Sequence, residues 1–231
     1  IGNPNVALWQ RNTQWPQQMH KDLLTGTLYF WTHSTPLFID EASGIRSYTS
    51  DDYAMYTLGT GGIKANQNGV EPTQYISSCQ GFFVEALQEG LITFNNNMTT
   101  TSHNDNFFKL NTTKMSENEN KIWLNLTNRE GAFSQILIGF INGATTKFDT
   151  KFDGLRLDSQ NPLNFYSLIE GQPFAIQGLP EYTGDEKIKL GLNSKIHDET
   201  LLKISIDHLE GNFTETDIIL HDKLLQIDHN L

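Results

Sequence analysis

Three acidic side chains in the second half of the chain have the types and spacing that could hold a hard cation. Asp149 and Asp153 are four residues apart in the segment 148–154 (FDTKFDG), which ends in a glycine turn, and Asp158 follows shortly. Carboxylate oxygens presented on a turn suit Ca²⁺. However, Lys151 lies between the two acids, the EF-hand pattern is absent, and Asx-type turn capping explains the same residues without a metal. The sequence therefore leaves two alternatives, a calcium site and a purely structural turn.

Aromatic side chains in the first half form a second candidate site. Tyr29, Phe30 and Trp31 are consecutive, so a strand through them must turn at least one ring outward, and Tyr53 lies in the same half. Exposed aromatic rings stack on sugars and anchor protein interfaces. The alternative is core packing from both faces of a central strand. We take Trp31, Tyr29 and Tyr53 as candidate ligand-binding residues, with a glycan or another protein chain as the ligand.

The motifs of common enzymes are missing from the sequence. The seven histidines include no His-Glu-x-x-His pair, and there is no Gly-x-Ser-x-Gly elbow. The segment 59–62 (GTGG) lacks the Gly-Lys-Ser/Thr that completes a phosphate-binding loop. A glycosidase needs two carboxyl groups at a set separation, and the sequence does not single out a pair. We therefore predict no catalytic residue, with a hydrolase as the remaining enzymatic alternative.

Composition and charge narrow the classes of partner. The 231 residues carry a net charge of −11 and only 19% charged residues, so neither nucleic acid nor an anionic membrane surface is expected as a partner. A polar but weakly charged composition is typical of extracellular β proteins. The single cysteine, Cys79, excludes an intrachain disulfide and is expected to be a small buried residue. No apolar run approaches the roughly 18 residues that span a bilayer.

The second half alternates between apolar and polar residues with a period of two. In its first strand Ile122, Leu124 and Leu126 face one way, while Trp123 and Asn125 face the other. We predict strands over 121–128, 135–141, 165–169, 173–177, 187–192, 202–207 and 217–221. Short strands separated by turn signals favour a β-sandwich.

The first half is less regular. The pattern predicts a short helix over 15–24, a flexible loop over 59–69, and strands over 28–32, 52–57, 75–77, 81–86 and 91–95. The polar stretch 111–120 is the candidate boundary. We predict an all-β fold, a jelly-roll or Ig-like β-sandwich of two packed subdomains, 1–110 and 121–231, joined by a linker over 111–120. A single larger sandwich is the alternative.

Several segments carry a family resemblance in a consistent order. They are 2–4 (GNP), 26–33 (GTLYFWTH), 52–56 (DYAMY), 81–84 (GFFV), 94–98 (FNNNM), 122–128 (IWLNLTN), 165–168 (FYSL), 176–178 (IQG) and 218–223 (IILHDK). Together they resemble the β-rich region that precedes the C-terminal sorting domain in type IX secretion system cargo proteins of Bacteroidetes, especially flavobacteria. Cys79 departs from the small residue that the pattern favours. The resemblance implies export across the outer membrane by that machinery, then surface display or release, and implies no catalytic activity.

Three functional hypotheses follow. The first is a non-catalytic, secreted or cell-surface module for adhesion or surface assembly, which contacts other surface chains, or copies of itself, through unpaired edge strands. The second is a carbohydrate-binding module of a secreted polysaccharide-degrading enzyme. The third is a secreted hydrolase.

Overall fold

The protein is built from β-strands. The computed structural model describes residues 23–32, 38–39, 46–47, 52–76, 80–92, 119–157, 162–184 and 186–231. These residues form fifteen strands and one 3-10 turn, η3 (Gly211–Glu215), but no α-helix. None of them forms a helix long and apolar enough to cross a membrane. The predicted all-β fold is confirmed.

A small antiparallel sheet comes from the first half of the chain. Its strand order is β5 (Gly61–Ile63), β4 (Tyr53–Thr57), β1 (Leu24–Trp31) and β6 (Phe83–Ala86). Leu28 and Phe30 are buried on one face of β1, and Tyr29 is buried on the other. Because both faces of β1 are covered, its second half, 28–31 (LYFW), is a continuous apolar run and does not alternate with polar residues.

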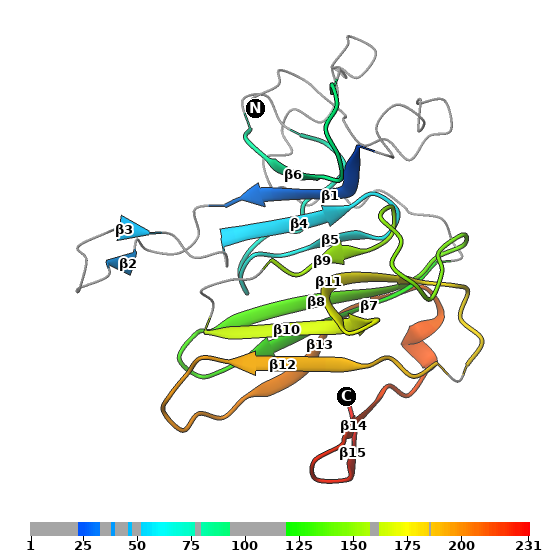
Figure 1. Cartoon of the computed structure of the whole chain (residues 1–231). Coiled ribbons are helices and arrows are strands. Elements are labelled where there is room, and N and C mark those ends of the chain that lie inside the picture. Colours follow the sequence, from blue (N-terminus) through cyan, green and yellow to red (C-terminus); the bar gives the residue numbers. More distant parts are fainter. Residues whose placement is uncertain are drawn as a thin grey trace.

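A larger sheet comes from the second half (Figure 1). Its strands are β7 (Asn120–Thr127), β8 (Phe133–Phe140), β9 (Gly154–Leu155), β10 (Leu163–Ile169), β11 (Gln172–Leu179), β12 (Leu190–Ser194) and β13 (Lys203–Glu210). The order is β12-β10-β11-β8-β7-β13, with β9 also paired to β11. All pairs are antiparallel except β11 with β8.

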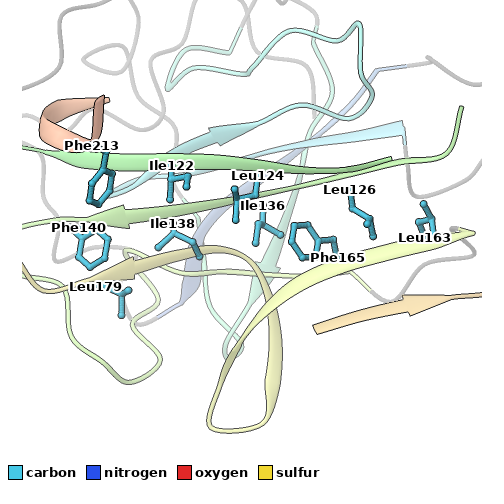
Figure 2. Packing of buried hydrophobic residues seen from close by; sticks show 10 residues of the cluster. All are labelled: Ile122, Leu124, Leu126, Ile136, Ile138, Phe140, Leu163, Phe165, Leu179 and Phe213. Carbon is cyan, nitrogen blue, oxygen red and sulfur yellow. The ribbon is translucent and has the colours of Figure 1, made fainter. Parts of the chain in front are cut away.

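The alternation predicted for β7 is confirmed. Ile122, Leu124 and Leu126 enter one buried cluster with residues of β8, β10 and β11, as Figure 2 shows. Trp123 enters a different cluster on the opposite face. The large sheet therefore buries apolar side chains on both faces. On one face they pack inside the curve of the sheet itself, and on the other they pack against the small sheet.

The two sheets form a sandwich with a shared core. Tyr29, Met55 and Ile63 from the small sheet pack with Trp123 and Leu137 from the large one. Within this layer the indole N–H of Trp123 donates to the carbonyl of Gly62 at 2.8 Å. The division into subdomains stays a prediction, because residues 111–118 of the expected linker lie outside the described residues.

Several local predictions are wrong. The loop predicted over 59–69 contains strand β5, which is fully buried. Its glycines serve close packing, since a Cβ on Gly62 would lie 2.5 Å from the carbonyl oxygen of Pro72. Leu24, the predicted end of the helix over 15–24, begins β1, and residues 15–22 of that helix lie outside the described residues.

Other strand boundaries also shift. In the predicted strand over 75–77 Ile76 makes a bridge and Tyr75 is in no strand, and in the one over 91–95 Leu91 and Ile92 are in no strand. Residues 77 and 93–95 of these two predictions lie outside the described residues. The strand predicted from residue 187 begins at Leu190.

Two small hairpins complete the described structure. One pairs β2 (Phe38–Ile39) with β3 (Arg46–Ser47). The other pairs β14 (Ile219–Asp222) with β15 (Ile227–Asn230) and projects beyond β12 and β13 in Figure 1. The C-terminal hairpin is tied to the large sheet at its base, where Ile218 and Leu231 pack against the cluster of Figure 2.

Candidate functional site

The predicted aromatic residues lie on one face of the small sheet. Trp31 and Tyr53 are direct cross-strand partners, and Tyr29 is opposite Phe83 of β6. Tyr29 is buried in the core between the sheets, where its hydroxyl donates to the carbonyl of Leu155 at 3.3 Å. Burial raises the pKa of that hydroxyl above its ordinary value. Tyr29 is therefore placed as a core residue, which was the alternative interpretation.

Trp31 and Phe83 are the exposed aromatic residues on the described part of this face. Their side chains are 37% and 60% exposed. The rings of Tyr53 and Phe83 meet edge to face, with centroids 5.6 Å apart and an interplanar angle of 80°. Because the two rings are nearly perpendicular, they do not form a flat surface on which a sugar ring could stack.

The acidic turn is organised around Asp153. The backbone N–H of Asp149 donates to one carboxylate oxygen of Asp153 at 2.6 Å, and the N–H of Gly178 donates to the other at 2.8 Å. The N–H of Lys151 donates to the carboxylate of Asp149 at 3.1 Å. These bonds support turn capping. Asp158 lies outside the described residues, and Ca²⁺ at this turn stays a prediction.

The same turn joins the two sheets. Its backbone carbonyls at 150 and 151 accept the N–H groups of Gly26 and Gly59 from the small sheet. The hydroxyl of Thr60 donates to the carbonyl of Phe152 at 2.6 Å. Burial raises the pKa of Asp153 to about 7, although the two backbone hydrogen bonds lower it. The turn is therefore a structural joint with an ionisable group inside it.

A third site, which the sequence did not reveal, lies on the face of β13 that is turned toward the small sheet. Nδ1 of His208 lies 2.8 Å from a carboxylate oxygen of Asp207, and Nε2 lies 3.6 Å from a carboxylate oxygen of Glu71. In the described ranges, these are the only three histidine, cysteine or acidic side chains whose ligand atoms all lie within 4.8 Å of one another. Glu71 reaches the site from the loop after β5, so the site is assembled from both sheets.

A β-bulge brings Asp207 and His208 to the same face. Ile206 pairs with Leu124 and His208 pairs with Trp123, which leaves Asp207 as the extra residue. Consecutive residues of a regular strand point to opposite faces, but in a bulge two residues oppose one. Alternation alone would have turned His208 into the core.

Hydrogen bonds hold Asp207 from three sides. Nζ of Lys64 lies 2.7 Å from Oδ2 of Asp207, and the amide of Asn125 donates to Oδ1 at 2.9 Å. Asn125 in turn accepts from the amide of Gln135 at 2.8 Å. Although burial opposes ionisation, the hydrogen bonds from Lys64, His208 and Asn125 lower the pKa of Asp207 to about 2. Asp207 is therefore a fixed negative charge beside the imidazole.

The imidazole is also held by stacking. The rings of Trp123 and His208 are 4.0 Å apart with an interplanar angle of 20°. Trp123 is itself fixed by its bond to Gly62. A histidine orientated by a carboxylate and an aromatic ring, with its second nitrogen toward another carboxylate, can bind a cation or exchange a proton.

Comparisons with known proteins identify a family but no characterised relative. No curated protein and no solved structure matches this chain. A family model described as a domain of unknown function, DUF8693, matches residues 1–231. The chain therefore belongs to the DUF8693 family.

Proposed function

We propose that this chain is a non-catalytic module of a secreted or cell-surface protein that acts in adhesion or surface assembly by binding a second copy of itself head to tail. The observation that carries this proposal is the projecting hairpin β14–β15. Leu224 and Leu225 at its tip are 91% and 62% exposed, and Ile219 and Ile227 on its strands are exposed as well. An isolated two-stranded hairpin is marginally stable in water, so an added strand would stabilise it.

The edge of the large sheet offers the complementary surface. β12 pairs with β10 on one side, and no described strand pairs with its other side. The N–H groups of Leu168 and Lys195 donate to the carbonyls of Lys189 and Pro162 across this pair. Because antiparallel bonding alternates along a strand, the N–H of Leu192 then points to the unpaired edge. Such an edge is a template for another strand.

Charge favours the pairing of these two surfaces. Three lysines flank β12, at Lys187, Lys189 and Lys195, next to one acid, Glu186, while the hairpin carries three acids, Asp217, Asp222 and Asp228, and one lysine, Lys223. Opposite charges across an interface steer association and set its register. A contact between two different surfaces of one chain is heterologous, so it builds rings or open filaments and not closed dimers.

The location and export route belong to the same proposal. The ordered resemblance to type IX secretion cargo supports export to the outer surface, and the polar, weakly charged composition supports an extracellular site. The partners would be the outer-membrane export machinery in transit and copies of this chain afterwards.

The test is a concentration series of the 231-residue chain by light scattering and sedimentation. We expect oligomers of increasing size. The hairpin variant Leu224→Asp/Leu225→Asp and the edge variant Leu192→Pro should each be monomeric, while Leu91→Asp, at an exposed leucine outside both surfaces, should behave as the wild type.

Mixing the two monomeric variants distinguishes head-to-tail contact from any symmetric one. The hairpin variant keeps an intact edge and the edge variant keeps an intact hairpin, so together they should form a dimer and stop there. A wild-type chain that stays monomeric at the highest attainable concentration, or a mixture that gives no dimer, would show the proposal to be wrong.

Glycan binding is the second candidate function, because Trp31 and Phe83 are exposed on the same sheet face. It predicts that the wild-type chain is retained on a glycan array and that folded Trp31→Ala is not. Equal retention of the two proteins, or no retention of either, would contradict it.

A further inference from the structure

We propose that Glu71 and His208 bind a divalent transition-metal ion of the Zn²⁺ class, with Asp207 as the residue that positions the imidazole. This site is separate from the hairpin and from the β12 edge, so the inference does not depend on the proposed function.

The distances match the requirements of zinc. Nε2 of His208 and the nearer oxygen of Glu71 are 3.6 Å apart. Zinc bonds of about 2.0–2.1 Å in a tetrahedron place neighbouring ligand atoms about 3.3–3.4 Å apart. To bind the ion, the two ligand atoms would have to approach each other by only a few tenths of an ångström. Glu71 can make this movement because it lies on a loop. Water would complete the coordination.

The second nitrogen of the imidazole is already engaged as metal sites require. Asp207 lies 2.8 Å from Nδ1, which fixes the tautomer that leaves the Nε2 lone pair directed at Glu71. A carboxylate bonded to the far nitrogen of a ligating histidine is the usual outer partner in zinc sites. The stacked ring of Trp123, 4.0 Å away, restricts rotation of the imidazole.

Glu71 gives an independent indication of a missing partner. The oxygen that faces His208 is buried and has no hydrogen-bond donor. A buried carboxylate oxygen without a donor is costly, and native structures leave few such atoms unexplained. A bound cation would satisfy this oxygen.

The groups around Glu71 favour a transition-metal ion over Ca²⁺ or Mg²⁺. Burial raises the pKa of Glu71 to about 7; Lys64 and Lys121 lower it, and Asp207 and Glu210 raise it. Lys64 already forms an ion pair with the carboxylate of Asp207. A hard ion such as Ca²⁺, which needs about six to eight oxygen ligands, would therefore have too few oxygen ligands here. An imidazole nitrogen and one carboxylate suit Zn²⁺ or Co²⁺ better than Ca²⁺ or Mg²⁺.

The test is calorimetric titration of the apo chain with Zn²⁺, supported by the visible absorption of bound Co²⁺. Saturable binding is expected for both ions and not for Mg²⁺. Glu71→Gln and His208→Gln should abolish it, and Asp207→Asn should weaken it about 10- to 100-fold.

The matched control is His221→Gln. His221 forms the same pair as His208, with Nδ1 2.7 Å from Asp228, but it is not part of a three-ligand group. Its variant should bind Zn²⁺ as the wild type does. Circular dichroism checks that each variant is folded. The inference is overturned if folded Glu71→Gln binds Zn²⁺ with wild-type affinity, or if His221→Gln is the variant that loses binding. It is also overturned if the folded wild type shows no saturable binding. Repeating the light-scattering series with a chelator keeps the result separate from self-association.

Discussion

Asp207 and His208 are neighbours in the chain, yet both side chains lie on the face of β13 that is turned toward the small sheet. The bulge at Asp207 produces this arrangement, after which Leu209 returns to the core side and packs against the cluster of Figure 2. The charged site and the cluster on the opposite face of β13 therefore share one irregularity of the backbone. The charged site also depends on the loop after β5, which brings Glu71 to it.

Zinc affinity should depend on pH through Glu71. Because the pKa of Glu71 is about 7, the carboxylate is mostly protonated at pH 6 and mostly ionised at pH 8. Binding requires the ionised form, so we expect affinity to rise about tenfold over this interval. Titration calorimetry at the two values measures it, and an affinity that does not change would show that Glu71 is not a ligand.

Removing the indole donor should loosen the contact between the sheets. In Trp123→Phe the buried carbonyl of Gly62 loses its donor, and the imidazole loses part of its stacking surface. We expect the free energy of unfolding to fall by about 1–3 kcal/mol. Urea denaturation measures the change, and stability equal to the wild type would mean that this bond does not help to hold the sheets together.

Adding one methyl group to β5 should be costly. A Cβ at Gly62 would lie 2.5 Å from the backbone oxygen of Pro72, so Gly62→Ala forces the chain to move. The expected loss is about 1–3 kcal/mol. Gly81→Ala is the control, because no atom lies within 4 Å of its added Cβ and its φ is not positive. If both variants unfold at the same denaturant concentration, the 59–69 segment is looser than a buried strand.

The turn at Asp153 should make stability fall as pH rises. Its pKa is about 7 in the fold against an ordinary value of 3.8, so the folded state binds the proton more tightly than the unfolded state. The stabilisation is fully present below about pH 4 and is lost as the pH rises through 7, at up to about 1.4 kcal/mol per pH unit.

Asp153→Asn isolates this contribution. Its amide oxygen can still accept from Gly178, but it has no proton to release, so the variant should lack this part of the slope. The quantity to measure is the difference between wild type and variant in unfolding free energy at pH 5 and pH 8, because Glu71 adds a slope of the same sign to both. A difference that is constant with pH would contradict the buried-carboxyl interpretation.

The all-β fold and the faces of the strands could be predicted from the sequence because they depend on local pattern. The period-two alternation of Ile122, Leu124 and Leu126 is enough to place these residues together on one face of the strand, whatever the strand packs against. The turn at Asp149 and Asp153 is local for the same reason, since a short acidic side chain caps backbone groups only a few residues away.

The site at His208 was decided by the tertiary structure alone. Glu71 and Asp207 are far apart in the chain, and no spacing rule relates a loop of one sheet to a bulge in another. Strand β5 escaped prediction for a related reason: its glycines resemble a loop, and the need for a residue without a side chain at Gly62 comes from Pro72, which no local pattern places beside it and which is close only in the fold. Local alternation determined which residues of a regular strand share a face, whereas contacts between the two sheets determined which polar residues meet.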